Sequence, residues 1–351
     1  MSEVRLREAL SNLPTYVAGK GDAGKIVKLS SNELPFPPSS TVMKAGEQAL
    51  AKINRYPSAI GADLVAKLSE HYRIDPEQVV VGPGSIQVLA NALSAVAQAG
   101  NNVVYAWRSF EAYPILVGIT GASSRQIPLT PSAQHDLAQI LAAVDENTAA
   151  VIVCSPNNPT GTSITQTEVR DFLSALPAQV LAILDEAYFE FDTSLDHVDG
   201  ATLLADFPNL LVLRTFSKAY GLAGLRCGYG LTSPQVGAAI RKVATPFGLS
   251  AVAEACALAA LADEAQMQRQ VSQICQERAR VVDKLRDLGW IIPQAGGNFI
   301  WFGGPVGAEI HKAALSQGLQ TRKFPEGVRV TIASREENDQ FLAAISQIKP
   351  R

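Results

Sequence analysis

The sequence has few residues of the kinds that form metal sites, disulfides or membrane spans. Its four cysteines (Cys154, Cys227, Cys256 and Cys275) include no C-x-x-C pair, and its four histidines show no H-x-x-x-H spacing. Isolated thiols are typical of small buried side chains in a reducing cytoplasm, and no structural metal is expected. The N-terminal residues lack the apolar segment of a secretory signal. No run approaches the roughly 20 apolar residues of a spanning helix. We therefore expect a cytoplasmic protein without a membrane partner.

An excess of charge of one sign is also absent. The formal net charge is −3, with acids and bases interspersed, so nothing in it predicts nucleic acid as a partner. No G-x-S-x-G elbow indicates a serine hydrolase. No G-x-G-x-x-G follows the first expected strand, which argues against a nicotinamide-binding fold. What remains is an ordinary globular composition in 351 residues, enough for a large domain and a small one.

Short apolar runs alternate with helix-length segments through the middle of the chain. The strand candidates are residues 79–81, 102–105, 149–154, 180–184 and 210–213, and a helix-like segment over 86–98 follows the first. Continuous apolar strands of this kind indicate a mostly parallel sheet with helices on both faces. We therefore expect an α/β fold with a large domain over residues 36–248.

The pattern changes near residue 249. One long helix is expected over 254–288, followed by a strand at 298–302, a helix at 306–317 and a strand at 328–332. These segments predict a smaller α+β domain over residues 249–351. Residues 1–35, with several glycines and prolines, are expected to form an arm that packs with the small domain.

Polar motifs follow the expected strands directly, where ligands bind in sheets of this type. The segment from Ser217 to Arg226 reads SKAYGLAGLR. A lysine between a hydroxyl and glycines suits a Schiff base to pyridoxal 5′-phosphate (PLP), and Ser217 and Arg226 can donate to its phosphate. The alternative, that Lys218 is a solvated loop lysine, is disfavoured by the glycine spacing and by Arg226.

Asp185 ends another expected strand, where an unpaired charge is expensive to bury. A buried carboxylate at this position is explained if it pairs with a pyridinium nitrogen. The alternative is that Asp185 is the N-cap of a helix. Tyr188 can donate to a phenolic oxygen, as can the amide in the turn Asn157–Gly161, which can equally be a plain turn. The turn at 82–85 resembles anion-binding turns at helix N-termini.

In their order and spacing, the segments GPGS, SPNNPTG, DEAYFEF, TFSKAYGLAGLRCGY and GVRVTIA resemble the histidinol-phosphate aminotransferase family of class II aminotransferases. The resemblance covers essentially the whole chain and implies a homodimeric PLP-dependent transferase of fold type I. It implies that Lys218 carries the cofactor, Asp185 pairs with the pyridine nitrogen, and Asn158 and Tyr188 contact the phenolic oxygen. The implied phosphate ligands are Gly84, Ser85, Ser217, Arg226 and, from the neighbouring subunit, Tyr56. Arg329 would hold the substrate α-carboxylate, and Tyr16, Asn32 and Arg322 are the other implied substrate contacts.

The segment expected beneath the cofactor ring departs from the family's usual proline-rich form and reads WRSFEAY over 107–113. Phe110 falls at the stacking position and offers an aromatic face without a hydroxyl. This form resembles the actinobacterial branch of phenylalanine or aromatic-amino-acid aminotransferases. We therefore expect ping-pong transamination between an aromatic amino acid and 2-oxoglutarate, in which Lys218 moves the proton.

Three alternatives share these motifs. Histidinol phosphate can replace the aromatic substrate if cations near Tyr16 hold its phosphate, and Arg322 and Lys323 are available for this. A PLP-dependent decarboxylase of the threonine-phosphate type would release CO₂ and need no keto acid. A non-catalytic regulatory protein of the same fold usually carries a DNA-binding segment, and this sequence has no basic stretch for one.

Overall fold

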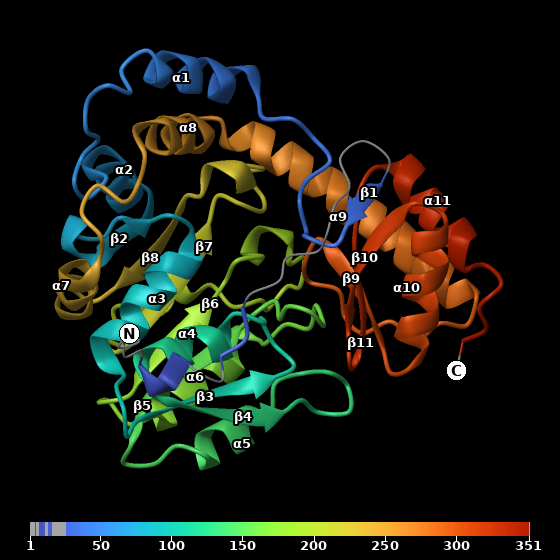
Figure 1. Ribbon diagram of the computed structural model, residues 1–351, viewed down its shortest axis with the longest axis horizontal. Helices are drawn as coiled ribbons and strands as arrows, with labels where there is room; N and C mark the ends of the chain where they lie inside the picture. Colours follow the sequence, from blue (N-terminus) through green and yellow to red (C-terminus); the bar gives the residue numbers. More distant parts are fainter. Residues whose placement is uncertain (1–3, 5–6, 11–12, 16–25, 351) are drawn as a thin grey trace.

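Two sheets organise the chain in the computed structural model, which describes residue 4 and residues 7–10, 13–15 and 26–350. The larger sheet has the strand order β2-β8-β7-β6-β5-β3-β4, and the smaller one has the order β1-β10-β11-β9. Figure 1 shows the two sheets side by side, with the long helix α9 (Glu264–Asp287) running from one towards the other.

The larger sheet is mostly parallel, as the sequence predicted. Its β8 runs antiparallel to both neighbours, and the other pairs are parallel. The strands are β2 (Val79–Gly82), β3 (Asn102–Trp107), β4 (Ser123–Pro128), β5 (Thr148–Cys154), β6 (Leu181–Asp185), β7 (Leu210–Thr215) and β8 (Gly228–Thr232).

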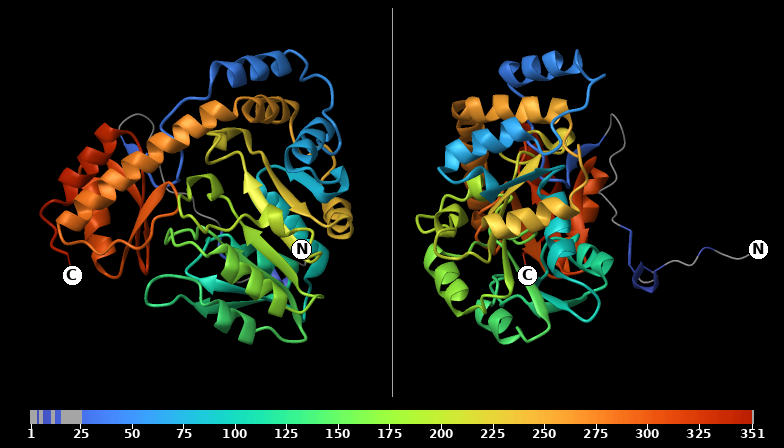
Figure 2. Two further views of the ribbon diagram at one scale, coloured as in Figure 1. Left: turned by 180° about the vertical axis from the view of Figure 1, so that it is seen from behind. Right: turned by 90° about the vertical axis from the view of Figure 1, so that its left-hand side faces the viewer.

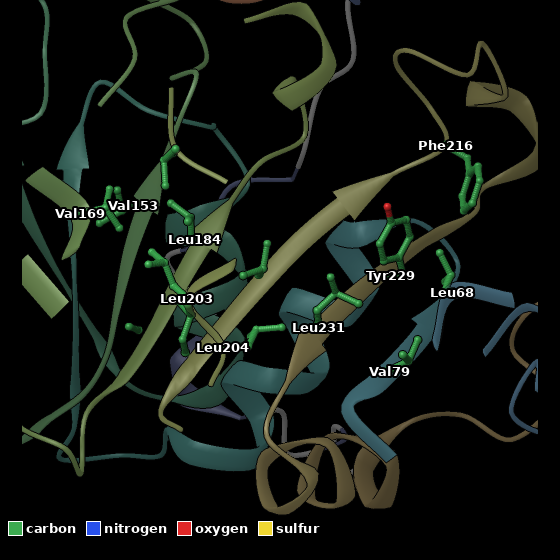
Figure 3. Close-up of a cluster of buried hydrophobic side chains, with 14 of the residues drawn as sticks. Leu68, Val79, Val153, Val169, Leu184, Leu203, Leu204, Phe216, Tyr229 and Leu231 are labelled. Carbon is green, nitrogen blue, oxygen red and sulfur yellow. The ribbon is translucent and has the colours of Figure 1, made fainter. Parts of the chain in front are cut away.

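Helices cover both faces of the larger sheet, which explains why its central strands are continuously apolar. Along β5, Val151 and Val153 belong to one buried cluster, and Ala150 and Ile152 belong to another. Figure 3 shows part of the first cluster. The helices of this part of the chain are α1 (Ser40–Leu50), α2 (Ala62–Tyr72), α3 (Ser85–Val96), α4 (Tyr113–Thr120), α5 (Leu137–Ala142), α6 (Gln166–Ala175), α7 (Pro234–Val243) and α8 (Ala251–Ala262).

The smaller sheet is antiparallel except at its edge, where β1 pairs parallel with β10. Since β1 comes from the N-terminal arm, residues 27–29 of the arm lie on the small sheet. Its strands are β1 (Val27–Leu29), β9 (Phe299–Gly303), β10 (Leu319–Phe324) and β11 (Gly327–Thr331), and α9, α10 (Val306–Ser316) and α11 (Arg335–Ile345) share its buried cluster.

The single long helix expected over 254–288 is wrong, because the chain breaks at Asp263 (φ −107°, ψ 41°) into α8 and α9. The two helices serve different cores: α8 packs on α1 and contributes Ala257 to the cluster under the large sheet, while α9 contributes Val281 to that of the small sheet. One straight helix cannot follow both surfaces, and Figure 2 shows the change of direction.

The expected domain boundary at residue 249 stays a proposal, and this packing favours moving it to Asp263. None of the helices described is long and apolar enough to cross a membrane.

Candidate active site

A cavity of about 360 Å³ is lined by residues from both sheets. Many of them follow the carboxyl ends of the parallel strands, where the sequence predicted that the polar motifs would meet. Ten predicted site residues line it: Ser85, Phe110, Asn158, Asp185, Tyr188, Ser217, Lys218, Arg226, Arg322 and Arg329. The convergence of these side chains from distant parts of the chain makes this cavity the candidate active site.

Lys218 lies three residues beyond β7, with its amine inside the cavity. The Nζ atom donates to the backbone oxygens of Ser31 at 2.9 Å and Asn32 at 3.3 Å. Burial lowers the pKa of Lys218 from 10.5 to about 7, and the positive charge of Arg329 acts in the same direction. An amine with such a pKa is partly neutral at neutral pH, so it can act as a nucleophile or a proton acceptor.

Asp185 is the last residue of β6 and is buried. The Tyr113 hydroxyl donates to its Oδ2 at 2.7 Å, and the Ala187 backbone N–H donates to its Oδ1 at 3.2 Å. Burial raises the pKa of Asp185, and within the described residues no cation counters that effect. The N-cap alternative fails because the following 3₁₀ helix, Phe189–Phe191, has Tyr188 at its N-cap. A buried carboxylate of this kind calls for a positively charged ligand.

An anion cradle lies at the N-terminus of α3, where Gly84 precedes Ser85. A Cβ atom at Gly84 (φ +83°) would come within 2.7 Å of the Arg226 guanidinium, and one at Gly228 would come within 2.2 Å of the Ser85 backbone nitrogen. Both positions therefore require glycine. Arg226 Nη1 donates to Ser217 Oγ at 3.1 Å. Backbone N–H groups at a helix N-terminus together with a guanidinium suit a phosphate group.

Tyr188 forms the wall between Lys218 and the small sheet. Asn32 Nδ2 donates to the Tyr188 hydroxyl at 2.9 Å, and burial raises the pKa of Tyr188 to about 12. Tyr188 is therefore a neutral hydrogen-bond partner near pH 7. The Asn32 side chain also accepts from the Thr331 hydroxyl, so it lies behind Tyr188 and outside the cavity wall. Its predicted direct contact with substrate stays a prediction.

Arg322 on β10 and Arg329 on β11 are directly opposite each other in the strand register. Arg329 donates to Asn158 Oδ1 and to the backbone oxygen of Ser30. Arg322 donates through Nε and Nη2 to the Glu111 carboxylate at 2.8–3.0 Å. Lys323, the next residue, is exposed and does not line the cavity. Of the two cations considered for a phosphate substrate, only Arg322 points inward.

The sequence matches the profile of one family, described as "Aminotransferase class I and II", over residues 24–345. The chain belongs to this family. It is 43% identical to an aromatic amino acid aminotransferase of Streptomyces coelicolor, over 99% of each chain, and 44% identical to one of Thermobifida fusca, over 96% and 95%. A histidinol-phosphate aminotransferase from Sinorhizobium meliloti, solved in complex with pyridoxal-5′-phosphate, superposes with a TM-score of 0.89 at 29% identity over 98% and 97%. The predicted family and fold class are confirmed.

Among the described residues, three predicted site residues do not line the cavity: Gly84, which precedes Ser85 at the anion cradle, Asn32, which lies behind Tyr188, and Tyr56. The Tyr56 side chain is 85% exposed, and its ring centroid lies 4.9 Å from that of Phe247. Its predicted role across a subunit interface stays a prediction. Tyr16 lies outside the described residues.

Sequence reasoning about the aminotransferase site did not single out Tyr113 or Glu111. Tyr113 is the first residue of α4 and has the appearance of an ordinary core aromatic, yet its hydroxyl holds Asp185. Glu111 has the appearance of a solvated loop acid, yet it binds Arg322 from the opposite sheet. A buried acid needs a donor and an inward arginine needs an acceptor, but the sequence does not say which residues supply them.

Proposed function

We propose that this chain is a PLP-dependent aminotransferase that moves the amino group between an aromatic amino acid, such as phenylalanine, and 2-oxoglutarate. The observation that carries the proposal is that one cavity contains both Asp185, a buried carboxylate with no cationic partner among the described residues, and Lys218, an amine with a pKa of about 7. The two relatives named as aromatic amino acid aminotransferases support the substrate class.

The residues of the cavity fit PLP. The cradle formed by Gly84, Ser85, Ser217 and Arg226 suits its phosphate, and a Cβ atom at Gly84 would fill part of that cradle. Asp185 suits the protonated pyridine nitrogen, because the cation would compensate the burial that raises its pKa. Tyr188 and Asn158 suit the phenolic oxygen, and Phe110 suits the ring face. When bound, PLP supplies an electron sink for the negative charge that develops at the substrate α-carbon.

The chain's own groups supply position and proton transfer. Lys218 would hold the cofactor, and its freed amine would carry the proton from the substrate α-carbon to the cofactor carbon that receives the amino group. Arg329 holds the α-carboxylate, which an amino acid and a keto acid share, so one guanidinium serves both halves of a ping-pong cycle. Burial of Asp185 and Arg329 keeps water away from the charges that orient the reaction.

Histidinol phosphate is the second candidate substrate, because the Sinorhizobium meliloti structure bears that name. Its phosphate carries more negative charge than a carboxylate and needs more than one cation. Arg322 lines the cavity, but the Glu111 carboxylate already binds it. The aromatic substrate is therefore favoured.

The test is a comparison of phenylalanine and histidinol phosphate as amino donors to 2-oxoglutarate, followed through glutamate formation. We expect a higher kcat/KM with phenylalanine. Efficient use of histidinol phosphate with negligible phenylalanine activity would overturn the aromatic assignment and leave the aminotransferase assignment standing. Release of CO₂ from threonine phosphate without a keto acid would identify a decarboxylase instead, and failure of every donor would favour a non-catalytic protein.

We also propose a cytoplasmic homodimer in which Tyr56 reaches the cofactor phosphate of the neighbouring subunit. Tyr56, Ile53 and Ile60 are 85%, 65% and 56% exposed, which is unusual for apolar side chains so close in sequence. The four cysteines are free thiols, which suits a reducing compartment. A fully active monomer in analytical sedimentation would remove Tyr56 from the site.

A further inference from the structure

We propose that Glu111 sets the net charge at the substrate end of the cavity and thereby selects substrates with a singly charged carboxylate over phosphate esters. The inference rests on the proposed function, since it concerns the end of the cavity where Arg329 would hold the substrate. Glu111 would then be a residue that determines specificity without taking part in the chemistry.

The contact between Glu111 and Arg322 is a forked ion pair. Arg322 Nε donates to Oε2 at 3.0 Å, and Nη2 donates to Oε1 and Oε2 at 2.8 Å each. The side chains are 28% and 17% exposed, so the pair is only partly screened by water. Forked pairs of this geometry are among the stronger charged hydrogen bonds in proteins. Both residues line the cavity, so the pair forms part of its wall.

The strand register explains why a carboxylate is needed at this place. Arg322 and Arg329 are directly opposite each other on β10 and β11, and like charges in that position destabilise a sheet. Arg329 donates to two neutral groups, Asn158 Oδ1 and the Ser30 carbonyl. Glu111 therefore supplies an acid to a pair of neighbouring guanidinium groups.

The charges at this end can be counted. Among the residues that the structure describes, Arg322 and Arg329 contribute two positive charges and Glu111 contributes one negative charge, a balance of +1. Glu33, another acid in the lining, is paired with Lys28 at 2.9 Å, so these two cancel. A carboxylate head group with one negative charge balances this net charge of +1. A phosphate ester with two charges exceeds it, and Glu111 would both compete with the ester for Arg322 and repel it.

The first experiment measures binding and does not depend on turnover. Two inhibitors that differ only in the head group, 3-phenylpropionate and 2-phenylethylphosphonate, are titrated calorimetrically into the PLP-loaded enzyme, whose cofactor phosphate fills the other anion site. The pH is set so that the phosphonate carries two negative charges. The variants Glu111→Gln and Glu111→Ala should shift the affinity ratio towards the phosphonate by about tenfold or more, because Arg322 becomes available to it.

Glu326→Gln is the matched control. Glu326 forms a similar forked ion pair with Arg108, at 2.8 and 3.0 Å, between the segment that follows β3 and the β10–β11 hairpin, but neither residue lines the cavity. Its loss removes a carboxylate and a link between the sheets without changing the charge inside, so the affinity ratio should stay at the wild-type value. In the double variant Glu111→Gln with Arg322→Gln, the shift of the affinity ratio towards the phosphonate should disappear.

The same variants should raise kcat/KM for histidinol phosphate relative to phenylalanine. An unchanged affinity ratio in both Glu111 variants would overturn the inference, and so would an equal shift in Glu326→Gln. A wild-type enzyme that prefers the carboxylate inhibitor, loses this preference in Glu111→Gln and yet does not transaminate phenylalanine would support the inference while overturning the proposed function.

Discussion

The two ends of the cavity are built in different ways. The cofactor end takes Asp185, Ser217 and Lys218 from the ends of neighbouring strands of one sheet, with glycines allowing close backbone approach. The substrate end takes Arg322 and Arg329 from the small sheet and Glu111 from the segment that follows β3, and charged hydrogen bonds join Glu111 to Arg322. The first arrangement fixes one geometry. The second can change its charge through one side chain, so substrate choice can vary without altering the chemistry.

Removing the amine should have the largest effect and tests whether the chemistry belongs entirely to the cofactor end. Lys218→Ala should abolish turnover, because no other lysine lines the cavity among the described residues. PLP should still bind through the cradle at Ser85 and Arg226. The measurement is steady-state activity together with borohydride reduction and mass analysis of the adduct. A reducible adduct at a different lysine would contradict the assignment.

Asp185→Asn should slow proton abstraction by about a hundredfold or more, because a neutral amide stabilises the pyridinium poorly. The fold should tolerate it. Since burial raises the pKa of Asp185, the ionised carboxylate destabilises the cofactor-free fold at neutral pH, and the amide removes that cost. The melting temperature of the cofactor-free variant should therefore equal or exceed that of the wild type. Near wild-type rates would show that the carboxylate has only a structural role.

Arg329→Lys probes the substrate end, and its effect should be smaller. Lysine keeps the charge but loses the forked geometry, so KM should rise about tenfold to a hundredfold, the value of one charge-assisted contact. The rise should be similar for phenylalanine and 2-oxoglutarate, because both present the same α-carboxylate. Stopped-flow measurements of the two half-reactions separate them. A rise confined to one substrate would mean that the two do not share Arg329.

The pH dependence of cofactor capture should report on Lys218 alone. With a pKa of about 7, the amine loses its proton as the pH rises through 7, and the neutral form is the nucleophile. The rate of covalent PLP attachment to the cofactor-free protein should increase about tenfold per pH unit below 7 and level off above it. Absorbance measured after rapid mixing gives this profile. In Arg329→Lys the midpoint should move little, because burial is the main cause of the shift. A midpoint near 10 would show that the amine is not desolvated.

The sequence predicted the cofactor end better than the substrate end. Strands β5, β6 and β7 are continuously apolar and directly precede polar motifs, so both their type and their convergence can be read from the pattern. Strand β4, Ser123–Pro128, was not predicted, because it lies at the sheet edge and exposes most of its residues. Strand β8 was not predicted either, because Gly-Tyr-Gly has low strand propensity and the burial of this strand comes from tertiary packing.

At the substrate end the missing information is long-range. Arg322 and Glu111 are 211 residues apart, and neither stands in a motif that implies the other. The position of Arg329 followed from a family resemblance, whereas its neighbour across the strands depends on the register of the hairpin. Whether Lys323 faces inward depends on strand alternation within β10, a strand that the sequence did not predict.

The segment that follows β3 is fastened to the β10–β11 hairpin at two points, through Arg108 to Glu326 and through Glu111 to Arg322. Two anchors with two residues between them restrict rotation of the segment, so this segment and the hairpin should move together whenever the small sheet shifts. Phe110 lies between the anchors. Phe110, the residue proposed to stack on the cofactor ring, is thereby tied to the hairpin that carries Arg322 and Arg329, so a displacement of one should be transmitted to the other.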